Sequence, residues 1–486
     1  MKCLIRFLAI AVALIFLLAP AQLERRMNIL VFPFRNTGSL QHSWISSGLT
    51  DTVIADLQRL KSVNVFSDEE RKKACNEIAL GMTGIIDDRD VAKAGYIMGA
   101  NLIFTGSYTV IGKSIRVVAK LVDVETTRLS KSRKLDGTLD GIFNLQDRIV
   151  AALMEETEAV EFKGIETPKF TEQEKKEVKK KHTPPRAAFE YYSRALEKYE
   201  SSPREALSLA MKAVQADPKY HNALTYVGGL YTNTGESVKA NQYYSLAKKA
   251  LVDSGMKDSA DYAHLLQNMA RASWNRGDNT SSIQYNMEAM KILELLEKKE
   301  SSNYADMLML LGSAYRNLGD LQKGLLYTRS AKETLERLGL RKTSLYSWNL
   351  SNLGVIHQLL KNYSTTLELY GEANRIWESL GMKRSSGYAY TYSQIGNVYY
   401  SKGEYQKALE FLKEGMALCE ELGFQNSIQY GNYSWTAANA LWMMGRYCDG
   451  VPYMKKAVDV YTSVGHAETS TAQNALRDFK NSCDKK

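Results

Sequence analysis

The strongest constraint on the fold is a repeat. Small residues that follow an apolar residue recur every 42 residues, at Gly228, Ala270, Gly312, Gly354, Gly396 and Ala438. A second series has the same spacing and consists of Gly255, Glu297, Gly339, Gly381, Gly423 and Gly465. Two series that share one period indicate a chain built from copies of a single structural unit.

Each unit has the pattern of two amphipathic helices joined by a glycine turn. Between Tyr392 and Gly423, apolar or small residues recur three or four positions apart on both sides of Gly403. This spacing is typical of helices that bury one face. The Leu-Gly pair that ends most units is a helix stop, because glycine readily adopts a left-handed backbone. The pattern predicts helical hairpins that stack side by side.

The order of these residues resembles the tetratricopeptide repeat (TPR) family. The fit is good in one unit, at Val227, Gly228, Tyr231, Ala240, Tyr244 and Ala247. Unit 263–304 departs most from the motif, at Ser273, Ser282 and Asn286. The 42-residue length is similar to that of kinesin light chain repeats. The resemblance implies an α-helical TPR superhelix (solenoid) of about seven hairpins over residues 187–465, with a capping helix and tail over residues 467–486.

Residues 27–160 have a different pattern and predict a smaller N-terminal α/β domain. We expect strands at 28–34 and 63–66, and helices at 44–60, 87–98 and 140–154. Residues 102–110 and 114–124 flank a turn signal and predict a β-hairpin. The charged, proline-containing segment 161–186 predicts a hydrophilic linker, parts of which are helical.

This N-terminal pattern resembles the TolB-like domain that precedes bacterial TPR arrays, and the related FlgO and CsgG-like families. The matching stretches are residues 29–34 with Asn36, residues 47–51, residues 99–106 and residues 116–123. The resemblance implies a role in envelope assembly or as an accessory domain of signalling proteins. A secretion pore is not expected, because the sequence has no lipobox cysteine and no long alternating hairpins.

The first 21 residues have the features of a secretory signal peptide. Lys2 and Arg6 precede an apolar run from Phe7 to Leu18, and a small-residue cleavage signal ends at Ala21. As a helix the run is about 18 Å long, shorter than a bilayer core of roughly 30 Å. We expect export to the periplasm or cell envelope. The alternative is an uncleaved inner-membrane anchor, which the positive charges that follow the run favour.

Four cysteines would remain after cleavage, namely Cys75, Cys419, Cys448 and Cys483. They are scattered and form no C-x-x-C pair, so we interpret them by default as buried or idle thiols. An oxidising compartment leaves open a disulfide between Cys448 and Cys483.

Motifs for catalysis, cofactors and metals are missing from the sequence. Gly112, Lys113 and Ser114 resemble the end of a phosphate loop, but the glycine required five places earlier is Ser107. The six histidines form no H-E-x-x-H motif and pair with no cysteine at ligand spacing. A net charge of +9, without a basic stripe, does not favour nucleic acid. We therefore expect no enzyme, no cofactor and no metal site.

A stacked array of hairpins curves, and the first helix of each hairpin lines its concave face. Helical geometry places offsets −6, −3, +1, +4 and +5 from the small residue on that face, with neighbouring asparagines beside them. The predicted partner-binding residues are Asn268, Arg271, Trp274, Arg316, Asn317, Trp348, Asn352, Gln358, Tyr390, Asn397, Tyr400, Trp435, Asn439 and Trp442. The alternative is that some of the aromatic residues pack as core between neighbouring units.

The function that the sequence favours is an exported, non-enzymatic scaffold or adaptor in the bacterial cell envelope. It would bind a protein or peptide partner in the concave groove, through aromatic anchors and polar side chains. One alternative is an envelope or outer-membrane assembly or secretion factor that oligomerises through its N-terminal domain and associates with a membrane. A second alternative is a membrane-anchored signalling adaptor.

Overall fold

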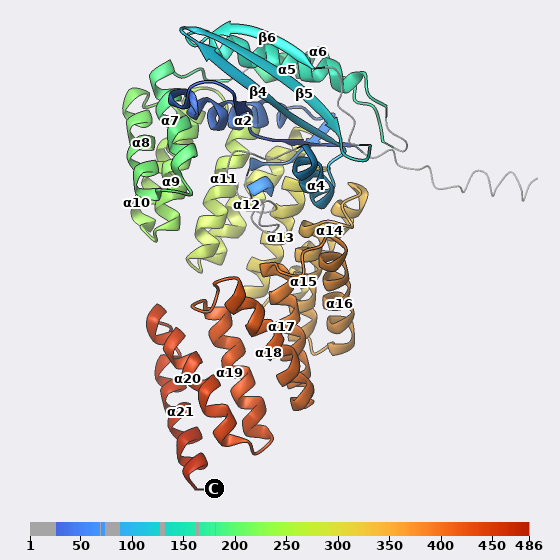
Figure 1. Ribbon diagram of the computed structural model, residues 1–486, viewed down its shortest axis with the longest axis vertical. Coiled ribbons are helices and arrows are strands. Elements are labelled where there is room, and N and C mark those ends of the chain that lie inside the picture. The colour runs from blue at the N-terminus through green and yellow to red at the C-terminus, as the bar shows by residue number, and fades with distance from the viewer. Residues whose placement is uncertain are drawn as a thin grey trace, which may run out of the picture.

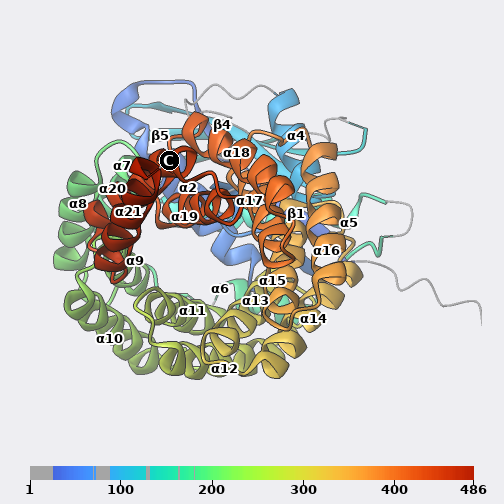
Figure 2. The same ribbon diagram turned by 90° about the horizontal axis from the view of Figure 1, so that it is seen from below.

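The computed structural model describes residues 26–68, 70–72, 88–126, 132–161, 165–179 and 181–485. In this part of the chain, seven helical hairpins follow a small sheet domain and wind into a superhelix (Figure 1; Figure 2). The prediction of a TPR superhelix with a smaller N-terminal α/β domain is confirmed. The expected signal peptide, residues 1–21, and Cys75 lie outside the described residues.

The hairpins are formed by consecutive pairs of helices. They are α7 (Arg186–Lys198) with α8 (Pro203–Ala216), α9 (His221–Asn233) with α10 (Ser237–Asp253), α11 (Ala260–Asn275) with α12 (Asn279–Leu295), α13 (Ser302–Asn317) with α14 (Leu321–Arg337), α15 (Ser344–Leu359) with α16 (Tyr363–Ser379), α17 (Ser386–Ser401) with α18 (Tyr405–Glu421), and α19 (Ile428–Met443) with α20 (Tyr447–Val464). A final helix, α21 (Thr469–Asp484), covers the end of the array. None of the described helices is long and apolar enough to cross a membrane.

Hydroxyl side chains begin five of the first helices. Ser259, Ser301, Thr343, Ser385 and Ser427 each accept a hydrogen bond from the backbone N–H three residues later. These N-caps stabilise the start of a helix. The residue three places after each cap is a tyrosine, and four of these tyrosines donate a hydrogen bond to a glutamate ten residues earlier, in the preceding hairpin. The caps and tyrosines fix successive hairpins to one another.

Glycine permits the close helix contacts within a hairpin. A Cβ atom on Gly354 would lie only 2.5 Å from the ring of Tyr370, so α15 and α16 could not pack as they do with any larger residue. The hairpin turns use left-handed backbone, in most cases at glycine. Among the described residues, two that are not glycine also adopt it, Glu297 with φ of 57° and Lys361 with φ of 59°.

The N-terminal domain contains a mixed sheet in the strand order β3–β1–β4–β5–β6. The strands are β1 (Met27–Val31), β2 (Arg35–Asn36), β3 (Val63–Val65), β4 (Leu102–Ile111), β5 (Ser114–Asp123) and β6 (Arg133–Thr138). β1 pairs in parallel with β3 and β4, whereas β4, β5 and β6 are antiparallel. Helices α2 (Trp44–Leu57) and α5 (Ile142–Glu158) cover one face. The short strands β2 and β6 were not predicted.

The other face of the sheet shares a hydrophobic core with the helical array. Leu30, Phe32 and Ile103 belong to one buried cluster with Leu338 and Leu340 from the end of α14 and the loop that follows. Helix α4 (Asp88–Met98) contributes to the same cluster. In Figure 1 the sheet domain accordingly lies across one end of the superhelix. The two domains therefore form a single packed unit rather than two tethered bodies.

Polar contacts also connect the domains. Asn28 donates from Nδ2 to the carbonyl oxygen of Leu338 at 3.2 Å, and Asn64 accepts from the backbone N–H of Ser302 at 3.1 Å. The buried amine of Lys298 donates to the carbonyl oxygen of Leu60 at 2.9 Å. These bonds satisfy buried polar groups at the ends of the repeat helices, where backbone donors and acceptors lack helical partners.

The segment 161–186, predicted as a hydrophilic linker, is docked on the sheet domain in its described part. Phe170 and Val178, the latter on α6 (Glu172–Lys179), are buried in the core of that domain. The carboxylate of Glu174 accepts a hydrogen bond from the Ser62 hydroxyl at 2.7 Å. Two apolar side chains and one buried carboxylate therefore anchor this charged segment to the sheet domain.

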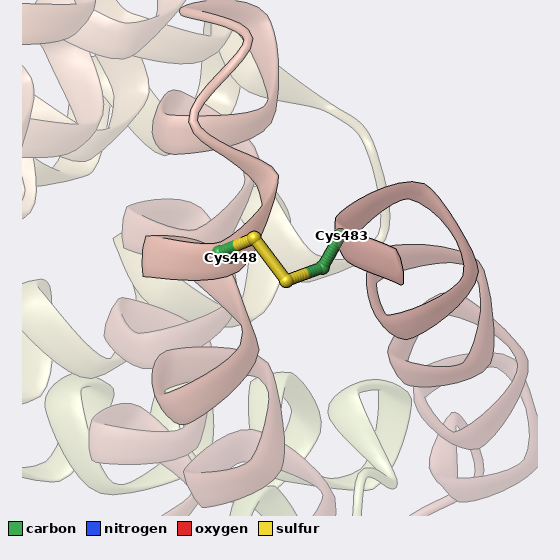
Figure 3. Close-up of a disulfide and its surroundings, with 2 residues drawn as sticks. All are labelled: Cys448 and Cys483. Carbon is green, nitrogen blue, oxygen red and sulfur yellow. A yellow bond between two sulfur atoms is a disulfide. The ribbon is translucent and has the colours of Figure 1, made fainter. Parts of the chain in front are cut away.

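A disulfide joins Cys448 on α20 to Cys483 on α21, with 4.8 Å between the two Cα atoms (Figure 3). The default interpretation of these two cysteines as idle thiols was wrong. The covering helix α21 brings Cys483 back to the start of α20, a juxtaposition that sequence spacing alone does not reveal. Cys419 is a buried free thiol.

Candidate functional site

The inner surface of the superhelix is formed by the first helix of each hairpin. In Figure 2, α11, α13, α15 and α17 lie inside, whereas α10, α12, α14 and α16 form the outer layer. All fourteen predicted groove residues lie on α11, α13, α15, α17 or α19. Thirteen are half-buried, and Asn317 is exposed.

Two columns of side chains run along these inner helices, with one residue from each helix. The first column contains Trp274, Arg316, Gln358, Tyr400 and Trp442. The second column contains His264, Asp306, Trp348, Tyr390 and Asn432. Because each column repeats with the 42-residue spacing of the helices, its members occupy equivalent places in successive hairpins.

An aromatic block lies in the middle of the array. The ring of Trp348 contacts that of Tyr390 on the next inner helix, with 5.7 Å between centroids. Trp348 also meets Trp377 edge to face at 6.1 Å. Tyr370 donates from its hydroxyl to Oε1 of Gln358 at 3.4 Å. Burial raises the pKa of Tyr390, which keeps the phenol neutral. The block offers large, half-buried rings of the kind that anchor partner segments.

Arg271 is already engaged within the array. Its guanidinium forms an ion pair with Asp306 on the next inner helix at 2.9 Å. Gln267 donates to the same carboxylate oxygen at 3.1 Å. Asp306 and Gln267 were absent from the predicted site, although both lie at offsets that had been assigned to the inner face. The three side chains link α11 to α13 and leave this part of the groove without excess charge.

Arg316 has a different environment from Arg271. Its Nε and Nη2 atoms donate to Oδ1 of the adjacent Asn317, at 3.3 and 3.0 Å. Asn317 in turn donates to Asn279 at 3.2 Å. No carboxylate of the described chain forms an ion pair with Arg316. Burial lowers the pKa of the guanidinium, and the phenols of Tyr390 and Tyr370 partly oppose that effect.

The predicted asparagines fall into two groups. Asn268 donates to the backbone oxygen of His264 at 3.0 Å, and Asn397 donates to Gln394 at 3.1 Å. Asn352 and Asn439 are half-buried and form no side-chain hydrogen bond within the described residues. In addition, Oδ1 of Asn397 and Nε1 of Trp274 are buried without a partner. Amide and indole groups that lack hydrogen-bond partners on one surface can form hydrogen bonds with the backbone of a bound peptide.

Aromatic packing fills the C-terminal part of the inner face. Trp442 contacts Phe479 of the covering helix α21 at 4.8 Å and Tyr447 at 4.7 Å. Trp435 stacks on Tyr461 at 6.0 Å. Tyr400 meets Tyr405, with 5.6 Å between centroids. Trp442 thus packs against the covering helix, which fits the alternative in which aromatic residues pack between units, and the contact of Trp348 with Tyr390 likewise joins two neighbouring units.

A small cleft between the two domains is lined by α2, α5, α9 and the docked segment. Its walls include Asp56, Arg59, Gln146, Lys181 and His221. The cavity measures about 30 Å³, which is room for one or two water molecules. Within the described residues, no group of three or more His, Cys, Asp and Glu side chains could hold a metal ion. The cleft is therefore a small gap lined by charged and polar side chains between the two domains.

Comparison with protein families identifies the repeat type. A tetratricopeptide repeat model matches residues 343–421, which include the hairpins α15–α16 and α17–α18. The chain therefore contains tetratricopeptide repeats. Among curated proteins it is similar to "Putative adenylate cyclase 3" of Rhizobium meliloti (strain 1021), with 24% identity over 136 residues. That alignment covers 28% of this chain and 22% of the relative, so the chain spans about a fifth of the relative's length.

Solved structures with similar helical architecture share little sequence with this chain. Aspartyl phosphate phosphatase F from Bacillus subtilis has 14% identity and a TM-score of 0.41, covering 70% of this chain and 91% of its own. A Rap protein complexed with Competence and Sporulation Factor has 14% identity and a TM-score of 0.42, covering 72% and 98%. A Pyrococcus horikoshii signal transduction ATPase with a tetratricopeptide repeat sensor has 14% identity and a TM-score of 0.48, covering 70% and 50%.

Proposed function

We propose that the chain is an exported, non-enzymatic scaffold that binds an extended segment of a protein partner along its inner groove. The observation that carries this proposal is the aromatic block of Trp348 and Tyr390, with the half-buried Asn352 four residues after Trp348 on the same helix. Rings supply apolar contact area at small entropic cost, and amides hydrogen-bond a peptide backbone of any sequence. This combination of side chains favours peptide binding over catalysis.

The proposed location is the bacterial cell envelope. Two independent features support it: the signal-like sequence of residues 1–21 and the disulfide between Cys448 and Cys483. Disulfides persist in oxidising compartments such as the periplasm and are rare in the reducing cytosol. Mass spectrometry of the mature N-terminus tests export. A chain beginning near Gln22 supports it, whereas an intact Met1 would favour the membrane-anchored alternative.

We also propose that the N-terminal domain is TolB-like and that the array consists of 42-residue repeats of the kinesin-light-chain kind. The strand and helix order of residues 27–158 and the constant spacing of the five helix caps support this. In this chain the domain acts as a fixed end of the array, because one sheet face is buried against the helices. The buried sheet face favours a scaffold. An assembly factor would need an N-terminal domain that acts separately from the array.

Site-specific photo-crosslinking in the producing cell tests the groove. A benzophenone amino acid replaces Tyr390 on the inner face. As a matched control it replaces Leu326, which lies on the outer helix α14 and is 60% exposed. We expect a discrete protein adduct from position 390 and none from position 326. An adduct from position 326 alone would refute binding in the groove.

A further inference from the structure

The sheet face that meets the helical array is covered over only part of its length. Ile103 on β4 and Val122 on β5 are buried in the cluster that the two domains share. Because side chains alternate along a strand, the same face of β4 continues with Thr105, Ser107 and Thr109, which are half-buried. In Figure 1, β4, β5 and β6 cross the top of the molecule, and α4 lies below their right-hand end. The array therefore covers one end of this face and leaves the rest accessible to solvent.

Basic residues line the accessible part of the face. The strand register places Arg35 on β2 and Lys134 on β6 in one cross-strand row, which runs through Ser107 and Val118. Lys120 points to the same side, because it lies two residues after Val118 on β5. Arg35 and Lys134 are exposed, and Lys120 is half-buried. Within the part of the chain that the structure describes, none of these three side chains forms an ion pair.

An acidic residue on this face is already paired. Asp136 on β6 lies opposite Arg116 on β5, and their side chains form an ion pair at 2.6 Å. The turn after β4 adds the exposed Lys113, which also has no ion pair within the described residues. The unpaired basic residues on the face and its turn are thus Arg35, Lys113, Lys120 and Lys134. Their positive charge makes the surface complementary to an anionic partner.

Two aliphatic side chains are strongly exposed at the end of the sheet where β4 stops. Ile111 is 78% exposed and Leu40 is 84% exposed. The backbone N–H of Thr37 donates to the carbonyl oxygen of Tyr108 at 2.9 Å, which holds the segment before Leu40 beside the last residues of β4. Exposed aliphatic side chains beside basic ones are typical of surfaces that bind the boundary between lipid headgroups and acyl chains.

This combination of side chains fits a lipid bilayer better than other anionic partners. Single-stranded nucleic acids stack their bases on aromatic rings, and the described residues of this face include none. Exposed aliphatic side chains gain nothing from the phosphate backbone of a duplex. A protein partner would need a buried apolar centre, whereas the centre of this face consists of hydroxyl and basic side chains around Val118. Hydrated, negatively charged headgroups match such a polar surface.

We propose that the N-terminal sheet domain docks on the surface of an anionic lipid bilayer. Ile111 and Leu40 enter the headgroup region, and the four unpaired basic residues face the lipid phosphates. The contact lies on the sheet domain, apart from the inner helices of the array, so it goes beyond the proposed function and does not depend on peptide binding. It would hold the scaffold at a membrane surface and leave the groove accessible.

Vesicle co-sedimentation of the full chain tests this proposal. The vesicles contain phosphatidylcholine, with or without a fixed proportion of phosphatidylglycerol. Because the apolar run at residues 7–18 has affinity for any bilayer, the measured quantity is the ratio of the two partition coefficients. At low salt the anionic vesicles should bind on the order of 100-fold better, and the ratio should fall as salt screens the charges. A ratio near one would overturn the proposal.

Charge variants test whether the proposed face makes the contact. Arg35→Gln with Lys134→Gln should lower the ratio by about 10- to 30-fold, at about fivefold for each basic residue. Arg35→Lys with Lys134→Arg preserves the charge and should preserve the ratio. As a matched control, Lys413→Gln with Lys455→Gln removes two exposed charges from α18 and α20 and should leave the ratio nearly unchanged. Equal losses in the two neutralised pairs would assign the effect to net charge and overturn the docking face.

Aliphatic variants test the insertion. Ile111→Ser should weaken binding to the anionic vesicles by about 3- to 10-fold, because an apolar side chain no longer leaves water. Val238→Ser is the control, since Val238 is 84% exposed on α10, and it should have no effect. Equal losses in the two variants, or none from Ile111→Ser, would refute insertion. Binding to duplex DNA without binding to either vesicle would assign the basic face to nucleic acid instead. Circular dichroism of each variant confirms that the chain remains folded.

Discussion

Leu340→Ala tests whether the sheet domain and the helical array share one core. Leu340 lies in the loop between α14 and α15 and is fully buried in the shared cluster. On the sheet-domain side it faces Gly99, where a Cβ atom would lie 2.7 Å from its Cδ2 atom. The contact with the sheet domain is therefore tight, and Leu340 is buried by residues of both domains.

The magnitude follows from the atoms removed. Truncation to alanine deletes three buried carbon groups, about 2.4 kcal/mol at roughly 0.8 kcal/mol each. The remaining cavity raises the total to about 3–4 kcal/mol. Leu326→Ala is the matched control, since Leu326 is 60% exposed on the outer surface of the adjacent helix; it should change the free energy of unfolding by less than about 0.5 kcal/mol.

Urea unfolding, followed by tryptophan fluorescence and by hydrogen exchange, provides the assay. Trp44 reports on the sheet domain and Trp377 on the array. With an m-value of about 2–3 kcal/mol/M, the midpoint should fall by roughly 1–2 M. Amide protection should be lost together in β1 and in α14. A loss confined to the helical array, or a change no larger than that of Leu326→Ala, would refute the shared core.

Three further outcomes are expected. Lys361→Gly should stabilise the chain by about 1 kcal/mol in thermal or urea unfolding, because Lys361 has a left-handed backbone with φ of 59°; a loss of stability would contradict this. Cys448→Ser with Cys483→Ser should free α21, at a cost of about 3–4 kcal/mol in its local stability, and hydrogen exchange of α21 no faster than before would count against it. Burial lowers the pKa of Lys298 to about 7. The unfolded chain then binds more protons than the folded chain between about pH 7 and pH 10. The original chain should therefore gain stability relative to Lys298→Met as the pH rises through this window, and the opposite slope would refute that pKa shift.

The hairpins could be predicted from the sequence because their signals are local. Apolar spacing, small residues such as Gly354 and hydroxyl caps such as Ser385 act within a few residues or between adjacent helices. Each of these signals recurs with the repeat, so the copies reinforce one another. Helix α4 and the hairpin of β4 and β5 likewise have distinct local patterns and lie where they were expected.

The docking of the sheet domain on the array could not be predicted in the same way. It depends on contacts such as Asn64 with Ser302, which are 238 residues apart. One signal was present in the sequence. Residues 29–32 are apolar without alternation, which is typical of a strand that is buried on both faces. Nothing in the sequence pattern, however, identified the helices that cover the second face.

Within the groove, the repeat spacing indicates which side chains lie on the first helix of each hairpin, but it does not indicate what they contact. Trp442 occupies the same column as Arg316, yet the covering helix α21 brings Phe479 against its ring. Arg271 is paired and Arg316 is not, because Asp306 lies within reach of the former only. Such differences arise from neighbours across helices, which the repeat pattern does not specify.

Hydrogen exchange of the full chain, with and without a peptide selected for binding to it, tests binding on the inner face most directly. Bound peptide should slow exchange in α13, α15 and α17, around Arg316, Trp348 and Tyr390. Exchange in the outer helices α12 and α14 should remain unchanged. Protection confined to those outer helices or to the sheet domain would contradict binding on the inner face.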